Sequence, residues 1–211
     1  MEPTTARERR HEKTRQSILE AARKIIAQEG HAALSMRAIA QRIDYSAAGL
    51  YEYFDSKEEI VAAVCEQGHR RLTEYMRRAD ESLPADEYLL ELGLAYLDFA
   101  ARNPDFFLLM FTSPATGPGG GPDTPEAAAL ADMHKDGSSF PLLLGAISRG
   151  IDEGIFRPKP GYGVLEMAFT AWGMVHGLAM LRIGHLSQFP GNFAPVERES
   201  LRRIGLGLMA E

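Results

Sequence analysis

The sequence has very little cysteine or tryptophan, with one of each among 211 residues, and no apolar signal segment at its start. The single cysteine, Cys65, excludes a disulfide framework and a cysteine-based metal site within one chain. Its helical spacing with Ile60, Val61 and Val64 favours a buried structural cysteine over a redox-sensing thiol. No apolar run reaches membrane length, so we expect a cytoplasmic protein with no membrane partner.

The usual sequence marks of an enzyme are absent as well. No glycine-rich phosphate loop follows a strand, no Cys/His spacing suits a metal ion, and no nucleophile motif is present. The six histidines are scattered along the chain rather than clustered. We therefore expect no catalytic site, no metal site and no cofactor.

Helical periodicity is present along the chain, and no strand-like alternation is found. It predicts an all-α fold of about nine to ten helices, with an N-terminal three-helix domain followed by a C-terminal helical domain. A long helix is expected from Lys57 to about Glu81. The last two helices are expected over about Gly161–His185 and Pro195–Met209. Thr112 to Pro125 is rich in Gly and Pro, which predicts an irregular loop that could gate a pocket or bind a partner.

Residues 34–61 carry the most specific pattern in the sequence. Ser35 can cap a helix whose apolar face repeats at Met36, Ile39, Ala40 and Ile43. Ala40 is small, as the close approach of a second helix requires. This spacing predicts a short helix that packs one face into a core.

A tight turn and a second helix follow. Asp44 falls at the turn, where left-handed backbone is expected, and Asp tolerates it better than most residues other than Gly and Asn. Ser46 can cap a second helix, predicted to run to about Phe54 with Leu50 and Phe54 inward. Two helices joined in this way form a helix-turn-helix, whose second helix enters the DNA major groove.

The start of a third helix comes directly afterwards. Ser56 and Glu59 form the Ser-x-x-Glu pattern of a capping box, and Lys57 lies in the first turn. There its charge and the free N–H groups of the helix start can meet a phosphate. The hydroxyls of Tyr51 and Tyr53 also suit phosphate oxygens. The segment is therefore predicted to bind DNA.

Charge is distributed unevenly. The formal net charge is −6, yet residues 7–24 contain seven basic and three acidic residues. We expect a flexible basic arm over about residues 1–12. Its Arg9 and Arg10, with Lys13, either contact the DNA backbone or minor groove, as N-terminal arms do elsewhere, or belong to a frayed, solvated start of the first helix.

These residues resemble the TetR family of transcriptional regulators. The resemblance covers residues 10–65 and is carried by Leu34 to Ala40, Ser46, Leu50-Tyr51, Tyr53-Phe54 and Ser56 to Glu59. It implies a homodimer that binds a near-palindromic double-stranded DNA operator. It also implies a DNA-binding domain over residues 1–56 and a dimerisation and effector-sensing domain over residues 57–211. The expected DNA-contacting residues are Ser35, Arg37, Tyr45, Ser46, Ala47, Ala48, Gly49, Tyr51, Tyr53 and Lys57.

Three residues depart from the pattern of that family. Asp44 replaces the usual Gly, and Gly49 stands where a hydroxyl residue is common. Glu52 places a carboxylate on the recognition helix, where it is either a solvated charge or an acceptor for a cytosine amine. With small residues at the front of that helix, base reading is expected to depend on neighbouring polar residues and on DNA shape.

Trp172, His176 and Gly177 resemble the Trp-His-Gly signature of the WHG type of C-terminal domain. Trp172 and His176 lie one helical turn apart and can touch. For His176, a hydrogen-bonded core or interface role is favoured over ligand or metal binding. In the family the last two helices of each subunit form a four-helix dimer interface. The implied interface residues are Trp172, His176, Gly177, Met180, Leu201, Ile204 and Leu208.

Bulky apolar residues of the second domain are candidates for an effector pocket, because small-molecule sites are mostly apolar. Each of them alone is better explained as ordinary core. Together they predict that an effector, where one exists, is hydrophobic or aromatic. The candidate lining residues are Phe106, Phe107, Met110, Phe111, Phe140, Leu144, Met167, Phe169 and Met174.

The sequence thus predicts a DNA-binding transcriptional regulator, in the form of a homodimeric repressor that a small hydrophobic effector releases from its operator. Repression is the usual mode of the family that the chain resembles. A regulator without a small-molecule effector, controlled by a partner protein, is the alternative.

Overall fold

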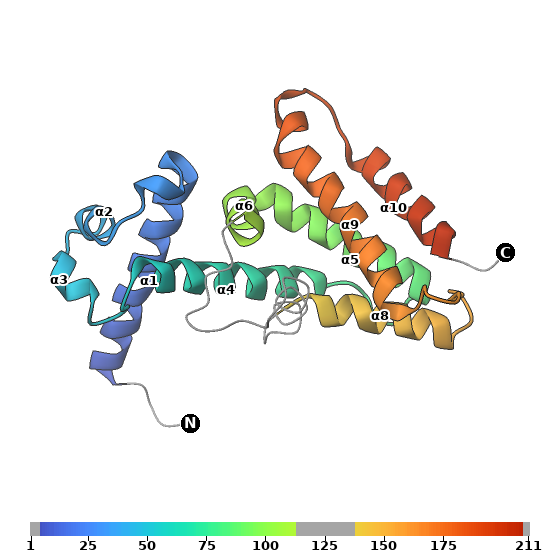
Figure 1. Cartoon of the computed structure of the whole chain (residues 1–211), viewed down its shortest axis with the longest axis horizontal. Helices are drawn as coiled ribbons and strands as arrows, with labels where there is room; N and C mark the ends of the chain where they lie inside the picture. Colours follow the sequence, from blue (N-terminus) through green and yellow to red (C-terminus); the bar gives the residue numbers. More distant parts are fainter. Residues whose placement is uncertain (1–4, 113–137, 209–211) are drawn as a thin grey trace. The chain divides into compact units, whose positions relative to one another are not determined.

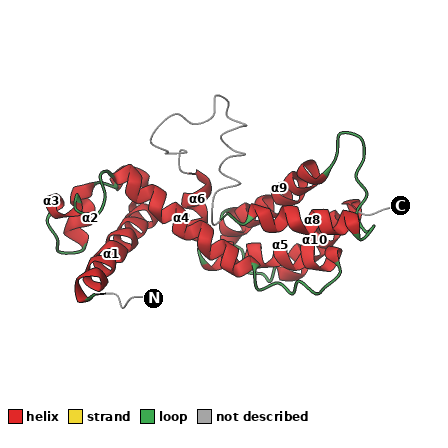
Figure 2. Cartoon of the chain, turned by 90° about the horizontal axis from the view of Figure 1, so that it is seen from below, coloured by secondary structure: helices red, strands yellow, loops and turns green. Residues whose placement is uncertain are grey.

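The computed structural model describes residues 5–112 and 138–208, without the side chains of Thr112, Ile204 and Leu206. These ranges are helical, and their only β pairing is a single antiparallel bridge between Lys159 and Tyr162 (Figure 2). The all-α prediction is confirmed. Of the loop predicted over Thr112 to Pro125, only Thr112 lies in the described range.

Contacts divide the described chain into two compact units. The first contains residues 5–68 and 105–112, and the second contains residues 69–104 and 138–208. The predicted boundary at residues 56 and 57 does not coincide with these units, because the beginning of α4 and most of α6 belong to the first unit. As a functional division that boundary stays a prediction. The helices that contribute to the first unit are α1 (Ala6–Glu29), η1 (His31–Ala33), α2 (Met36–Arg42), α3 (Ala47–Leu50), α4 (Lys57–Met76) and α6 (Pro104–Thr112).

Helix α1 begins earlier than the sequence suggested. Thr5 and Glu8 form a capping box: the Thr5 hydroxyl accepts from the Glu8 N–H at 3.2 Å, and the Glu8 carboxylate accepts from the Thr5 N–H at 2.6 Å. These two bonds satisfy N–H groups that a helix start otherwise leaves open. The flexible arm predicted over residues 1–12 is therefore wrong for residues 6–12, which are helical, and residues 1–4 lie outside the described range.

The core of the first unit forms where α1 meets the helix-turn-helix and the start of α4. The apolar faces predicted for these helices are buried. Burial of this apolar surface is the main term that stabilises the unit. The core side chains include Ile18, Leu19, Ala22, Ile25, Ile39, Ala40, Leu50, Phe54, Ile60, Val61 and Val64.

Helix α6 completes this unit from a distant part of the chain. Arg23 of α1 forms an ion pair with Asp105, and its guanidinium lies 5.1 Å from the ring centroid of Phe106. On α4, Gly68 leaves space that the side chain of Met110 occupies. Cys65 is half-buried rather than fully buried, with its Sγ 3.8 Å from the carbonyl oxygen of Leu109.

The second unit surrounds α5 (Ala85–Arg102), which packs against α8 (Phe140–Asp152), α9 (Val164–Ile183) and α10 (Ala194–Leu208) (Figure 1). The short η2 (His185–Gln188) follows α9. Helix α4 ends at Met76 rather than near Glu81. The buried cluster at the centre contains Ala85, Phe140, Leu143, Ile147, Phe156, Met167, Ala168 and Leu208.

Arg149 of α8 holds the turn between α4 and α5. Its guanidinium donates to the carbonyl oxygens of Glu81 at 2.7 Å and Leu83 at 2.8 Å, and it lies 4.8 Å from the ring centroid of Tyr88. Glu153 forms an ion pair with Arg149 at 3.2 Å and accepts from the N–H of Ala85 at 3.1 Å. A side chain of α8 thus supplies hydrogen bonds that the turn cannot make internally.

Candidate DNA-binding surface

Two serines start the two helices of the helix-turn-helix. Ser35 precedes α2, and its hydroxyl accepts from the N–H of Ala38 at 3.1 Å. Ser46 precedes α3, and its hydroxyl accepts from the N–H of Gly49 at 2.9 Å. Both capping predictions are confirmed. The second helix is shorter than expected, because α3 ends at Leu50 and residues 51–53 form turns.

Asp44 adopts the left-handed backbone predicted for the turn, with φ of 53°. The N–H of Tyr45 then bonds to the carbonyl oxygen of Ala40 at 2.9 Å, which closes the turn after α2. Ala40 is buried, as the close packing of α2 and α3 requires. The reversal that sets the angle between the two helices is thus fixed by local backbone chemistry.

Gly49 has a specific neighbour that the sequence did not predict. A Cβ placed on Gly49 would lie 2.7 Å from Cε1 of Tyr45 and 2.9 Å from Oγ of Ser46. The ring of Tyr45 therefore occupies the space that a side chain at position 49 would need. A side chain at position 49 would therefore have to displace the exposed ring of Tyr45.

The expected contact residues lie on the surface of the first unit or at its edge. Tyr45 and Tyr51 are 41% and 56% exposed, and Ser35, Arg37, Ser46 and Ala48 are exposed as well. The half-buried members of the set are Ala47, Gly49, Tyr53 and Lys57. All ten thus reach solvent, and they come from α2, α3, the turns beside α3 and the start of α4.

The third helix start keeps only part of its predicted capping box. The Ser56 hydroxyl accepts from the N–H of Glu59 at 3.1 Å, as predicted. The Glu59 carboxylate accepts from the N–H of Asp55 at 2.6 Å and not from that of Ser56. Lys57 lies 3.9 Å from the carboxylate of Glu58, a long surface pair that leaves its charge available.

Three of the basic residues near this surface are held by acidic partners. Arg42 forms an ion pair with Glu29 at 2.6 Å, and Arg23 and Lys24 both pair with Glu20. Farther toward the start of α1, Arg7, Arg9, Arg10 and Lys13 are exposed. The positive charge of α1 is therefore concentrated in its first two turns.

Sequence reasoning missed two residues that touch this surface. The imidazole of His11 stacks on the ring of Tyr53, and Arg15 lies over the ring of Phe54. The ring of Tyr53 meets Tyr45 edge-on, with 6.2 Å between centroids, and a hydrogen bond with Tyr53 raises the pKa of Tyr45. The four-residue spacing of His11 and Arg15 was the available signal, since such residues share one helix face.

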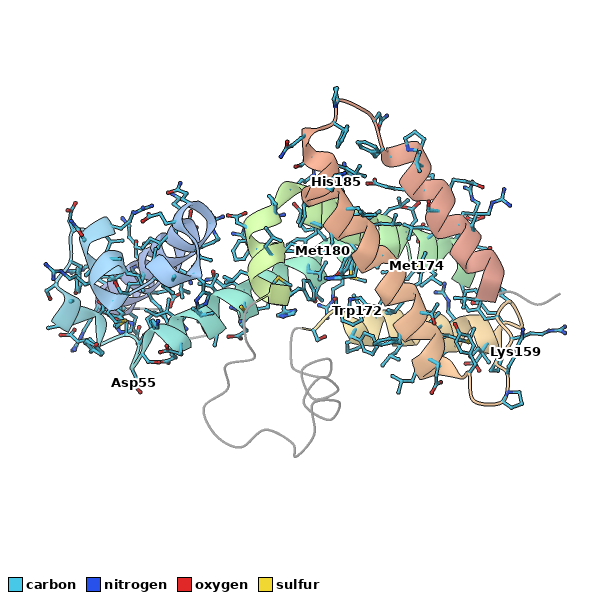
Figure 3. All side chains as sticks on the ribbon, turned by 45° about the horizontal axis from the view of Figure 1, so that its top comes forward. Asp55, Lys159, Trp172, Met174, Met180 and His185 are labelled. Atoms are coloured by element: carbon cyan, nitrogen blue, oxygen red, sulfur yellow. The ribbon has the colours of Figure 1, made fainter. Side chains whose placement is uncertain are left out.

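In the second unit, the residues predicted for a dimer interface fall into two groups. Trp172, His176, Gly177 and Met180 lie along α9, where Figure 3 labels Trp172 and Met180, and Leu201, Ile204 and Leu208 lie on α10. The rings of Trp172 and His176 have centroids 5.6 Å apart, which confirms their predicted contact. The Nδ1 of His176 lies 2.9 Å from the hydroxyl of Tyr96, a hydrogen bond directed into the unit. Burial lowers the pKa of His176 and raises that of Tyr96.

The outward face of α9 is a stripe of residues spaced four apart. We call Leu165, Phe169, Gly173, Gly177 and Leu181 the α9 stripe; all are exposed, with Phe169 at 58% and Leu181 at 49%. No described atom lies within 4 Å of a Cβ placed on either glycine. Of the predicted interface residues, only Gly177 belongs to this stripe, while the rest of those on α9 are partly buried beside it.

The interface prediction is partly wrong for the residues on helix α10. Leu208 is buried in the core cluster, so assigning it to an interface with another chain is wrong. Leu201 packs over Gly93 of α5, and the side chain of Ile204 lies outside the described residues. Between α9 and α10 is a shallow open groove lined by Met174, Pro195, Val196, Glu199, Ser200 and Arg203.

The predicted pocket residues are divided between the two units. Phe106 and Phe107 are buried in the first unit, where Phe107 also contacts Phe111. Phe140 and Met167 belong to the buried cluster of the second, with Leu144 packed against it. Phe169 is 58% exposed, so the prediction that it lines an inter-helical cavity is wrong, whereas Met174 lines the open groove between α9 and α10.

Residues 164–188 are long and apolar enough to span a membrane, judged by length and composition alone. The expectation that no apolar segment reaches membrane length is therefore wrong. The buried residues of α9, Met167, Ala168, Val175 and Ala179, pack within the second unit as those of a core helix do. Arg182 near its end pairs with Glu197 of α10 at 2.7 Å. These contacts are typical of a helix in a water-soluble protein.

Comparison with known proteins identifies the chain. Residues 18–64 match the bacterial regulatory proteins of the tetR family, and residues 89–204 match the tetracyclin repressor-like C-terminal domain. The chain belongs to the TetR family. The prediction made from residues 34–59 is confirmed, while the finer assignment to the WHG type stays a prediction.

Relatives and solved structures agree with this assignment. The chain is 26% identical over 136 residues to the HTH-type transcriptional regulator Rv1816 of Mycobacterium tuberculosis, covering 63% of this chain and 57% of that protein. It is 34% identical over 91 residues to the HTH-type transcriptional regulator UidR of Escherichia coli, covering 42% and 46%. The chain thus spans about half the length of these curated relatives. The TetR family transcriptional regulator PfmR of Thermus thermophilus superposes with a TM-score of 0.66 at 26% identity, over 92% of this chain and 99% of that one.

As a member of the TetR family, the chain is a DNA-binding regulator of transcription and not an enzyme. Its first unit contains the helix-turn-helix of that family, and the match to the family's C-terminal domain covers most of the second unit together with α6 of the first.

Proposed function

We propose that this TetR family member is a cytoplasmic homodimeric repressor, which binds a near-palindromic operator and is released by a small hydrophobic or aromatic effector. The observation that carries the proposal is the presence of two separate exposed surfaces. One is the outer face of the helix-turn-helix in the first unit, and the other is the α9 stripe in the second unit.

The α9 stripe supports a second copy of the chain as partner. Its leucines and Phe169 are apolar and exposed, and its two glycines leave the helix backbone open for close approach. A two-fold dimer uses the same patch on both subunits, so a self-complementary apolar stripe suits it. The helix-turn-helix surfaces of the two subunits would then be related by a two-fold axis, so they would recognise a palindromic site.

On the helix-turn-helix, the proposed roles follow from position and chemistry. Arg37 and Tyr45 are exposed polar side chains at α2 and before α3, where base edges are within reach. Tyr51, Tyr53 and Lys57 lie after α3 and at the start of α4, and we assign them to phosphates. Affinity should then fall steeply with salt, by a slope of about −0.9 per phosphate contact.

An effector can act only by favouring a conformation that does not fit the operator. DNA must then weaken effector binding by the same factor. Phe140, Leu144 and Met167 supply an apolar environment suited to such a ligand, and Met side chains adapt to different ligands. The second candidate function, control by a partner protein, is supported by the open groove between α9 and α10.

Selection of bound duplexes from a random DNA pool tests the proposal. We expect an enriched near-palindrome whose affinity has a strong salt slope. Selection should be repeated after denaturing, stripping and refolding the protein, because a co-purified effector would hold it in the released state. Failure to enrich a motif in both preparations would overturn the operator-binding function.

Thermal unfolding with a library of hydrophobic and aromatic compounds tests the effector. Ligands that bind the folded state raise its stability by mass action. A true effector should raise the melting temperature and release the selected duplex. A compound that raises stability without releasing DNA contradicts the proposed mechanism of release.

A further inference from the structure

His11 occupies a defined place beside the proposed DNA-contacting surface. The centroid of its imidazole lies 4.5 Å from that of the Tyr53 ring, with 27° between the ring planes. One turn further along α1, the Arg15 guanidinium lies 5.0 Å from the ring centroid of Phe54. Two side chains of α1 therefore contact two of the three aromatic residues that follow α3.

The position of His11 depends on the early start of α1. The capping box of Thr5 and Glu8 makes the first turn helical, so the backbone of His11 is fixed. The side chain is exposed, and among the described residues neither ring nitrogen has a hydrogen-bond partner. The imidazole thus presents one face to Tyr53 and keeps both nitrogens available to a ligand.

Tyr53 contacts a second aromatic residue of the proposed DNA-contacting set. Its ring meets that of Tyr45 edge-on, with 6.2 Å between centroids, while its other contact is the stack on His11. Tyr53 is therefore packed between α1 and the residue that precedes α3.

Charges of both signs lie near this cluster. Arg7, Arg9 and Arg10 precede His11 on α1 and are exposed, so this end of the helix carries basic side chains on the surface. Bonds to the N–H and hydroxyl of Thr5 lower the pKa of Glu8, so it stays ionised and engaged in the helix cap. The titratable and charged groups nearest to His11 along α1 are Arg7, Glu8, Glu12 and Arg15, and those on the segments beside α3 are Tyr45, Glu52 and Tyr53, of which Tyr53 contacts its ring.

We propose that His11 is a DNA-contacting residue that also positions Tyr53: its ring holds Tyr53 by stacking, and its protonated form binds the backbone phosphate beside Tyr53. The inference rests on the proposed operator binding. It gives operator binding a dependence on pH, because histidine changes its charge between about pH 5 and pH 8.

The sign of this dependence follows from the charge. The imidazolium adds a positive charge next to a phosphate, so the charged form binds DNA more tightly. The gain is present at acidic pH and disappears as the pH rises through the histidine range. By linkage, binding of DNA takes up protons in that range.

The test measures affinity for the selected operator at about pH 5.5 and pH 8, where histidine is mainly charged and mainly neutral. For the wild type we expect about tenfold tighter binding per protomer at the lower pH, near the lower end of what a hydrogen bond to a charged group contributes. The salt slope should also steepen by about 0.9 per protomer, because one more phosphate is neutralised.

Three substitutions separate charge from stacking. His11→Phe keeps the stacked ring and should bind at both pH values like the wild type at pH 8. His11→Arg stacks a permanent cation and should bind at both pH values like the wild type at pH 5.5. His11→Ala should bind more weakly than His11→Phe at every pH, because Tyr53 loses its support.

His31→Phe is the matched control, since His31 is an exposed histidine of the same unit without this stack. It should keep the pH dependence of the wild type. A pH-independent wild type, or a pH-dependent His11→Phe, would overturn the phosphate contact. Equal binding by His11→Ala and His11→Phe would overturn the positioning role. If no variant bound DNA at either pH, the proposed operator-binding function itself would fail.

Discussion

Gly49 affects the DNA-binding surface because it has no side chain. The ring of Tyr45 lies where a Cβ at that position would be, so the two positions share one space at the start of α3. Tyr45 thereby supplies a hydroxyl at the front of the recognition helix, which otherwise carries only Ala47, Ala48 and Gly49.

Gly49→Ala should weaken operator binding without weakening the fold. The new methyl group displaces Tyr45, and loss of one hydrogen bond to DNA lowers affinity about threefold to tenfold. The free energy of unfolding should stay constant or rise by up to about 1 kcal/mol, because Ala favours helix over Gly. Fluorescence anisotropy with the selected duplex and thermal unfolding measure the two effects.

The control for this change is the double variant. On a Tyr45→Ala background, Gly49→Ala should have no further effect on affinity, since the side chain that it displaces is already gone. Additive losses from the two substitutions would show that position 49 acts on DNA by another route.

His176 should make stability depend on pH. Burial lowers its pKa in the folded protein, whereas an unfolded histidine titrates near about 6.5. The unfolded chain therefore binds more protons as pH falls below that value, and stability decreases until the pH passes the lower, folded pKa. Protonation places a hydrogen on both ring nitrogens, so Nδ1 can then only donate to the Tyr96 oxygen 2.9 Å away.

Denaturant unfolding between about pH 7.5 and pH 5 measures this loss. His176→Gln should flatten part of the pH dependence, while His185→Gln, which changes an exposed histidine of the same unit, should leave it as it is. A wild-type profile that rises toward acidic pH would contradict the assigned direction.

Single residues with local roles were predictable from sequence. Ser35, Ser46 and Asp44 act on backbone groups within a few positions of themselves, and the structure has all three as predicted. Phe169 and Leu208 were not predictable, because the choice between core and surface depends on which helices pack alongside. The spacing of apolar residues defines a face, but it does not say what covers that face.

Among the elements, the turn between α4 and α5 depends most on a distant side chain. Arg149 bonds to two of its carbonyl oxygens, and an apolar replacement would leave the half-buried one of Leu83 without its donor and the exposed one of Glu81 to water. Arg149→Met should lower the free energy of unfolding of the second unit by about 1–3 kcal/mol. Denaturant unfolding of the full chain is the measurement.

Arg149→Lys is the matched control, since it keeps the charge near Glu153 but cannot form the two-pronged contact. It should recover only part of the loss. Full recovery by Lys would mean that the ion pair, and not the fork of hydrogen bonds, stabilises the turn.

Element boundaries were harder to predict than element types. The start of α1 at Ala6 does not follow from composition, since a run of charged residues suits a solvated arm as well as a helix. The pair of Thr5 and Glu8 fits a capping box, but without the apolar run that normally follows one the pattern is weak. At the other end, α3 stops at Leu50 because residues 51–53 turn to bring Phe54 into the core.

For the whole molecule, the α9 stripe predicts the state of association. Phe169→Glu places a charge on its most exposed aromatic residue and should give a folded monomer. Operator affinity should fall by about a hundredfold or more, because a monomer has one DNA-binding unit and lacks the avidity of two linked ones. Analytical ultracentrifugation gives the mass, and Ala27→Glu on the exposed side of α1 is the control that should stay dimeric. A dimeric Phe169→Glu protein with normal affinity would exclude the stripe as the interface.

The first unit is assembled from two separated stretches of the chain, which matters while the protein is being made. A ribosome releases α1 to α4 well before α6, so a nascent chain that ends at Arg102 lacks the residues that Arg23 and Gly68 contact. The first unit should therefore reach its final packing only after α5 and α6 have been synthesised. Translation pauses placed before Asp105 should lengthen the time during which the incompletely packed first unit is accessible to proteases and chaperones.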